Sequence, residues 1–383
     1  MSIDLAAAEE LFAVSTDATV GLEEEFAILD AASLDLVPRF EELRDLAAAE
    51  DPVLSEAIAG ELISSEIEIR SGRGEDLHDA LRRQRDGRSR LFGLGEARGI
   101  ALGATGTHPW ADYRAQRNID TEHYRRVVDG LRYVARRNNT FSLHVHVGAR
   151  DIDRAVRACD RLRPVLPLLL SISANSPYLD ARDSGLHSAR SQAFTKSFPR
   201  CGIPDAFGSW QAYRDYIDFL IRTESIMEYT QVWWSIRPHL SFGTVEVRIC
   251  DAQSTAAESE ALSGLIVASV AQALRDIDEG VPFTDPPRRL VEENFWRAIR
   301  FGQDGTLLDL DRGEGFAAAA AAERLLQWTA PVRAELGIDP AFPSLNGAQR
   351  QRRAIDSGAS MQEVFAAAVR ETSQTYVQEA ETA

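Results

Sequence analysis

Four segments of this 383-residue chain alternate between apolar side chains and side chains that carry carboxylate, imidazole or guanidinium groups. They read VGLEEEFAILD from Val20, ELISSEIEIRS from Glu61, TFSLHVHVG from Thr140 and GTVEVRICD from Gly243. Because successive side chains of a β-strand point to opposite faces, each segment predicts a strand with one apolar and one polar face. A sheet made of these strands has one face that other elements must cover.

The polar face of these strands gathers groups that can bind metal ions. By parity it carries Glu23 and Glu25, then Glu66, Glu68 and Arg70, then His144 and His146, then Thr244, Glu246 and Arg248. For any single strand, a polar face in water is the better interpretation. Across four strands, the repeated carboxylates would repel one another unless cations lay between them. The set therefore favours Mg²⁺ or Mn²⁺, which prefer oxygen ligands, over zinc.

Phosphoryl transfer is the chemistry that such a face favours. Mg²⁺ is commonly held by a few carboxylates together with substrate phosphates, and arginine supplies a bidentate fork for phosphate oxygens. Arg248 shares a face with Glu246, and Arg237 lies a few residues upstream. Surface ion pairs remain the alternative for both, since the chain has 42 basic residues. Strict alternation also places Cys250 on the polar face, where a buried structural thiol is the more ordinary interpretation.

The charge balance excludes several other classes. The net charge is −17, and Lys196 is the single lysine, so we expect neither nucleic acid nor an anionic membrane surface as a partner. No P-loop sequence is present. No apolar run is long enough to span a membrane, and the N-terminus lacks the features of a signal peptide. Three distant cysteines form no disulfide framework, so we expect a cytoplasmic protein.

Strands and helices are mixed up to residue 256, and helices dominate afterwards, which is an α+β pattern. We expect a lead-in helix in residues 1–17 and a single catalytic domain in 18–380, whose part 256–380 is helical. The long polar segment 175–204 is expected to be functional or disordered. The expected helices are 41–50, 76–98, 121–138, 151–174 (kinked near Pro164 and Pro167), 210–223, 256–279, 289–300, 316–337 and 359–380, and a further strand is expected at 100–107.

Six segments, in order between about residues 18 and 260, resemble the carboxylate–amine ligase family, also called glutamate–cysteine ligase type 2. They are VGLEEEF, ELISSEIEI, GTHPW, HVHVG, SANSPY and IRPHLSFGTVEVR. The resemblance implies the fold of glutamine synthetase and the guanidino kinases, a curved antiparallel sheet that forms an active-site cleft and is backed by helices. It also implies ATP-dependent ligation, in which a carboxylate, typically the γ-carboxylate of L-glutamate, is phosphorylated and then attacked by an amine such as L-cysteine.

The same resemblance implies roles for individual residues. Glu61 is the weakest of them, because strand parity puts it on the opposite face from Glu68 unless a turn or bulge intervenes. For His108, capping of the tight turn before Pro109 is an equally good interpretation. The implied metal ligands are Glu23, Glu25, Glu61, Glu68, His144 and Glu246; the catalytic and phosphate-binding residues are Arg237 and Arg248, with His146 on phosphate; the substrate-binding residues are Arg190, Thr107, His108, Arg70 and Glu66.

Two other functions stay open at this point. One is a phosphotransferase that uses the same ATP and metal site on a small acceptor. The other is a non-catalytic binding homologue, which the intact Glu and His positions of the polar face argue against. The implied cofactors are ATP as substrate and Mg²⁺ or Mn²⁺, a homodimer is expected of the family, and the physiological amine is left open.

Overall fold

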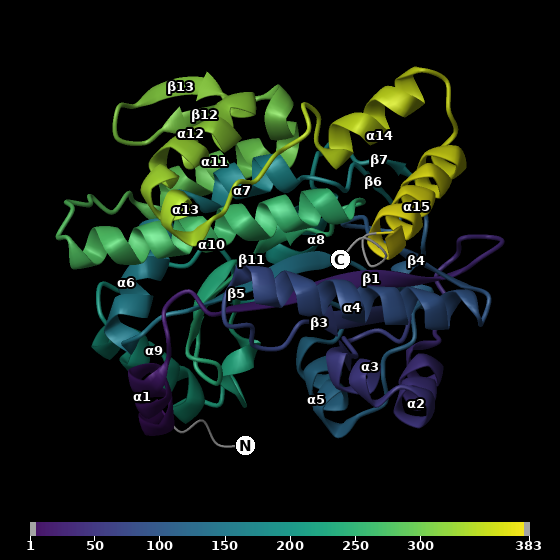
Figure 1. The fold of residues 1–383 in the computed structure, drawn as a ribbon, viewed down its shortest axis with the longest axis horizontal. Helices are drawn as coiled ribbons and strands as arrows, with labels where there is room; N and C mark the ends of the chain where they lie inside the picture. The colour runs from purple at the N-terminus through teal and green to yellow at the C-terminus, as the bar shows by residue number, and fades with distance from the viewer. Residues whose placement is uncertain (1–4, 379–383) are drawn as a thin grey trace.

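The computed structural model describes residues 5–378, which are built around a seven-stranded antiparallel sheet (Figure 1). The strand order is β10–β11–β5–β1–β3–β2, and β4 pairs with the C-terminal part of β1 on the same edge as β5. The strands are β1 (Val20–Asp30), β2 (Ile58–Ala59), β3 (Glu66–Arg70), β4 (Ile100–Gly103), β5 (Ser142–Gly148), β10 (Ile236–His239) and β11 (Thr244–Asp251). The long strand β1 therefore pairs with three other strands.

Helices cover the apolar face of this sheet. In Figure 1, α4 (Leu77–Glu96) and α10 (Ala256–Asp278) run along it; α4 contacts β1, β3 and β4, and α10 contacts β5. Helices α6 (Ile152–Leu162) and α7 (Leu166–Ser173) pack on β11. The remaining helices are α1 (Leu5–Val14), α2 (Phe40–Glu50), α3 (Pro52–Ala57), α5 (Glu122–Leu131), α8 (Ala189–Thr195), α9 (Trp210–Arg222), α11 (Arg288–Phe301), α12 (Ala321–Trp328), α13 (Ala330–Leu336), α14 (Gly347–Asp356) and α15 (Met361–Gln378).

The alternation of the strands explains why the helices pack on this side. Leu22, Val145 and Val245 are essentially inaccessible to solvent and belong to one large apolar core with the helix residues behind them. Phe26 and Ile67 belong to a second core, closed by α4 and α15. Each such side chain contributes about 1.5–3 kcal/mol on burial, so the apolar face determines which side of the sheet stays open.

One carboxylate lies on the apolar face, between Leu22 and Phe26. Glu24 receives two hydrogen bonds from Arg88, at 2.6 and 2.7 Å, and one from Gln84 at 2.7 Å. Because a buried charge is tolerated only when it is paired and hydrogen-bonded, these contacts from α4 satisfy Glu24. They also hold β1 to the helix layer at the point where Glu23 and Glu25 face the other way.

Most of the expected elements are present, with shifts at their ends. The helix expected at 151–174 is broken between Leu162 and Leu166, where Pro164 cannot continue it. The polar segment 175–204 folds into α8, the strand pair β6 (Tyr178–Leu179) with β7 (Arg182–Asp183), and β8 (Cys201–Gly202). Strand β8 pairs with β9 (Trp233–Trp234), which lies beyond the segment. The lead-in expected at 1–17 contains α1, whose Phe12 packs in the large core; residues 1–4, and 379–380 of the last expected helix, lie outside the described part. The division into domains stays a prediction.

Four expected boundaries are wrong. The strand expected from Glu61 begins only at Glu66, because residues 60–65 form a turn and a bend after β2. The helix expected at 121–138 ends at Leu131, and the strand expected at 100–107 ends at Gly103. The helix expected from residue 316 starts inside a hairpin of β12 (Thr306–Asp309) and β13 (Glu314–Ala317). Strand β10 and helix α14 were not expected.

A β-bulge in β11 changes the predicted facing of its last residues. Val247 pairs with Val145, but the next paired residue, Cys250, pairs with Leu143, so β11 has one residue more than β5 over this stretch. Cys250 consequently turns to the large core and is buried there. The expectation that Cys250 continues the polar face is therefore wrong.

Candidate active site

The polar face of the sheet lines a cavity of about 410 Å³. Side chains of β1, β3, β5, β10 and β11 form its floor, and residues of α5, α8 and the β8–β9 region form its walls. The strand register explains the convergence, because Glu23 pairs with both Arg70 of β3 and His144 of β5. Residues that are far apart in the sequence therefore meet at the centre of the sheet.

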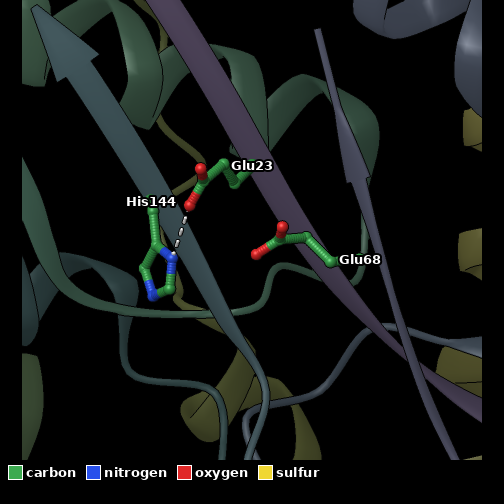
Figure 2. Close-up of side chains that lie close together, drawn as sticks. All are labelled: Glu23, Glu68 and His144. Atoms are coloured by element: carbon green, nitrogen blue, oxygen red, sulfur yellow. Dashed lines mark hydrogen bonds and ion pairs between the residues drawn. The ribbon is translucent and has the colours of Figure 1, made fainter. Parts of the chain in front are cut away.

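The first candidate metal group lies where β1, β3 and β5 run side by side. Figure 2 shows Glu23, Glu68 and His144 directed toward a common space, and each offers a ligand atom within 4.8 Å of the others. The Nδ1 atom of His144 lies 3.1 Å from a carboxylate oxygen of Glu23. Two carboxylates and an imidazole at this spacing can hold a divalent cation.

Two further groups overlap with the first. Glu23 also meets His146 and Glu246, and Glu68 also meets Glu25 and Glu61, again with ligand atoms within 4.8 Å. The Nε2 atom of His146 lies 3.3 Å from Glu23 and 3.8 Å from Glu246, yet it is buried and makes no hydrogen bond. An orphaned imidazole nitrogen between two carboxylates fits a metal ligand well.

Glu61 reaches its group through the turn that replaces the expected start of the strand. The backbone reverses between β2 and β3, so the parity that placed Glu61 opposite Glu68 does not apply. Tyr124 of α5 supports this turn by donating to the carbonyl of Gly60 at 2.5 Å. The structure thus brings Glu61 beside Glu25 and Glu68, as a metal ligand would require.

The electrostatics of the cavity differ between its two ends. Burial, and then the charge of Glu25, raises the pKa of Glu61 to about 8, and burial with neighbouring carboxylates likewise raises the pKa of Glu66 and Glu68 well above the ordinary value. Burial acts in the same direction on Glu246, but Arg237 and Arg248 outweigh it and hold its pKa well below the ordinary value. The part of the cavity around Glu61, Glu66 and Glu68 therefore lacks positive charge, which divalent cations would supply.

Arg237 and Arg248 both contact Glu246 but differ in what they can still bind. Arg237 donates to Glu246 at 2.5 and 3.2 Å and to the carbonyls of Thr230 and Val232, which uses four of the five donors of its guanidinium. Arg248 donates to Glu246 from one nitrogen, and its Nε has no partner. Arg248 is therefore the better placed of the two to meet a phosphate, and Arg237 mainly positions Glu246.

Arg190 lies under the bulge. Its two terminal nitrogens donate to the carbonyls of Arg248 and Ile249, each at 3.1 Å, and one of them lies 3.6 Å from Asp251. Its Nε is buried without a partner, and so is one carboxylate oxygen of Glu66 in the same cavity. These two side chains thus keep polar atoms that a substrate could still satisfy.

The other expected substrate residues are placed differently. Arg70 lines the cavity and lies 3.7 Å from Glu68, with 41% of its side chain exposed. Thr107 and His108 are fully buried and do not line it. Thr107 donates to the carbonyl of Tyr178, and His108 contacts the carbonyl of Leu34 while accepting from the backbone of the turn after it. The structure therefore favours the turn-capping interpretation of His108.

Several residues of the cavity were missed at the level of the sequence. Ser142 donates to Glu25 at 2.6 Å and contacts His144 at 2.7 Å; it lies two residues before His144 on the same face, so the alternation could have found it. His239 could have been found in the same way from Arg237. Tyr124 and Phe242 also line the cavity, and no local pattern marks them.

The fold matches that of two solved ligases. The described helices include none that is long and apolar enough to cross a membrane. The glutamate–cysteine ligase of Francisella tularensis, solved in complex with AMP, superposes with a TM-score of 0.68 at 12% identity, covering 94% of this chain and 89% of that one. A bifunctional glutathione synthetase from Pasteurella multocida gives a TM-score of 0.65 at 14% identity, over 97% of this chain and 54% of that one, so this chain spans about half its length. The fold is that of these ligases.

A sequence model of glutamate–cysteine ligase family 2 matches residues 19–381, and the chain belongs to this family. A Rubrobacter xylanophilus protein named "Putative glutamate--cysteine ligase 2-1" is 37% identical over 91% of this chain and 93% of its own length. A Solibacter usitatus protein named "Putative glutamate--cysteine ligase 2" is 34% identical over 92% and 93%. The expected family and fold class are confirmed.

Proposed function

We propose that this protein is an ATP-dependent carboxylate–amine ligase that activates the γ-carboxylate of L-glutamate and joins it to an amine such as L-cysteine. The observation that carries the proposal is the overlap of three oxygen-rich donor groups with Arg248 and Glu246 inside one cavity. Carboxylates with nearby arginine are the parts that phosphoryl transfer needs.

The reaction has two steps. An oxygen of the substrate carboxylate attacks the γ-phosphorus of ATP, the bond from that phosphorus to the bridging oxygen breaks, and ADP leaves. The amine nitrogen then attacks the carbonyl carbon of the acyl phosphate, the carbon–oxygen bond to phosphate breaks, and the nitrogen gives its proton to the departing phosphate. Phosphorylation is needed because a free carboxylate is a poor electrophile.

The residues of the cavity divide this work. Glu23, Glu25, Glu61, Glu68, His144 and Glu246 would hold the divalent cations, whose chemistry when bound is to neutralise phosphate charge. Arg248 contributes positive charge to the transferring phosphoryl group, and Arg237 keeps Glu246 ionised and oriented. Arg190 and Glu66 offer their unpartnered atoms to the carboxylate and the ammonium of an amino-acid substrate.

A turnover assay tests the proposal. The protein is incubated with ATP, Mg²⁺ and L-glutamate, with and without a panel of amines; ADP is measured by a coupled assay and products by mass spectrometry. We expect ADP formation that depends on both glutamate and an amine, with an amide as product. ADP formation that requires glutamate but is independent of the amine would favour the phosphotransferase. An absence of ADP formation with every amine in the panel would favour the binding homologue.

Variants test the assignment of the metal ligands. Glu25→Gln keeps the shape of the side chain but removes a charge, and Glu246→Ala removes the carboxylate between the two arginines. Each should lower turnover by at least about 100-fold while circular dichroism and thermal unfolding show a folded protein. The matched control is Glu56→Ala, since Glu56 is exposed on α3 outside the cavity. Undiminished turnover in Glu25→Gln would contradict the metal assignment.

A further inference from the structure

An exposed aromatic ring lies at the margin of the cavity. Phe242 is in the turn between β10 and β11, lines the cavity, and keeps 56% of its surface exposed. A large apolar ring left open inside a polar cavity is informative, because it has a flat face to offer to a ligand.

The ring of Phe242 is supported from behind. It stacks on the ring of His239, with centroids 4.2 Å apart and planes inclined by 11°. His146 meets both rings edge-on, at 5.1 Å from His239 and 5.5 Å from Phe242. Since His239 covers one face of Phe242, the exposed surface includes the opposite face.

The turn that carries Phe242 is held in place. The backbone N–H groups of Phe242 and Gly243 both donate to the carbonyl of His239 at 3.1 Å, and Gly243 adopts a φ of 65°, which a glycine allows. The hydroxyl of Tyr229 accepts from the backbone N–H of Ser241 at 3.1 Å and lies 3.3 Å from a ring nitrogen of His239. The platform is thus arranged before any ligand binds, which lowers the entropic cost of stacking.

The three rings adjoin the part of the cavity proposed to hold phosphate. His146 touches Phe242 on one side, and its Nε2 lies 3.3 Å from Glu23 and 3.8 Å from Glu246 on the other. Glu246 is in turn paired with Arg248. We propose that Phe242 is the stacking platform for the base of the nucleoside triphosphate whose phosphates lie against Arg248 and the metal groups. This inference rests on the proposed use of ATP.

Trp233 is the other aromatic residue that could receive a base, and it is the poorer candidate. Its ring lies edge-on to Phe198 at 5.6 Å, and the guanidinium of Arg200 lies 5.9 Å from its centroid. Trp233 is only partly exposed and pairs with Cys201 through β8 and β9, whereas Phe242 keeps more than half of its surface open. Because stacking strength grows with the area of the base, we expect purines to be preferred over pyrimidines. Because Phe242 offers no hydrogen bond to the edge of a base, we expect ATP to be distinguished only weakly from GTP.

Binding measurements on the full chain test the platform. Isothermal titration with a non-hydrolysable ATP analogue and with inorganic tripolyphosphate, both with Mg²⁺, separates the base from the phosphates. Phe242→Ala and Phe242→Leu should weaken the ATP analogue by about 5- to 100-fold and leave tripolyphosphate unchanged, whereas Phe242→Tyr should bind like the wild type. The matched control is Phe219→Ala, because Phe219 is 52% exposed on α9 and does not line the cavity.

Each outcome decides the question. Unchanged affinity of Phe242→Ala for the ATP analogue overturns the platform but not the ligase, and a loss found instead in Trp233→Ala moves the base to the other aromatic wall. Equal weakening of tripolyphosphate shows that Phe242 acts on the phosphate site and not on the base, which also overturns the inference. No binding of the ATP analogue to the wild type overturns the proposed function together with the platform.

Discussion

Replacing Glu61 by glutamine should make the metal-free protein more stable at pH 8, although it removes a residue of the proposed active site. The carboxylate of Glu61 lies with those of Glu25 and Glu68, within 4.8 Å. Burial and the neighbouring charges raise its pKa from the ordinary 4.5 to about 8 in the folded protein. Glutamine has the shape of the protonated form and carries no charge to repel.

The sign of the effect follows from the raised pKa. Below about pH 4.5 the carboxyl is protonated in both the folded and the unfolded chain, and its contribution to stability is fully present. Between 4.5 and about 8 the unfolded chain ionises while the folded chain keeps its proton, so stability falls as the pH rises. The complete shift corresponds to about 5 kcal/mol at 1.36 kcal/mol per pH unit. Because the neighbouring carboxylates share the titration, we expect Glu61→Gln to recover between about 1 and 5 kcal/mol.

Calorimetry in a chelating buffer can measure this gain. For a chain of this length each kcal/mol corresponds to about 1 °C in Tm, so Glu61→Gln should melt about 1–6 °C higher than the wild type at pH 8 and at nearly the same temperature at pH 5. Excess Mg²⁺ should reverse the order at pH 8, because the wild type gains more from the cation. Glu56→Gln, at an exposed position, is the control. A gain equal at pH 5 and pH 8, or no gain in chelator, would refute the reasoning.

Three further predictions follow from buried contacts. Arg88→Met leaves Glu24 charged and unpaired in the core, so the free energy of unfolding should fall by about 3–5 kcal/mol in urea denaturation, and adding Glu24→Gln should recover part of that loss. His108→Ala should lower Tm but leave KM for glutamate unchanged in the folded enzyme, because the His108 ring contacts the turn and not the cavity. A raised KM would instead show that His108 contributes to substrate binding. Asp251→Ala removes the acceptor of two serine hydroxyls and one backbone N–H, and should cost about 1–3 kcal/mol or more in the same denaturation assay; an unchanged midpoint would contradict this.

The alternation of the sequence was sufficient to predict much of the sheet. Val20–Asp30 was expected as a strand and is β1 with those bounds, and the parity of Glu23, Glu25, Glu68 and His144 is the parity seen in the cavity. Parity is a local property of an extended chain, set by the backbone of each strand alone. It needs no knowledge of the partner strand, so it can be read from the residues.

Other features depend on pairing between distant segments, and only the tertiary structure decided them. The turn before β3 brings Glu61 to Glu25, and the bulge against β5 sends Cys250 to the core while Arg190 binds the carbonyls it exposes. The four hydrogen bonds that Arg237 donates to Glu246 and to two carbonyls likewise depend on β10, which the sequence did not reveal.

The sequence by itself thus determined the polar face of the sheet and the family. The fold decided which side chains of the polar face keep atoms free to meet a ligand. The physical reason is that a strand's facing follows from its own backbone, whereas a hydrogen-bond partner or an open ring face, such as that of Phe242, follows from what other segments place beside it.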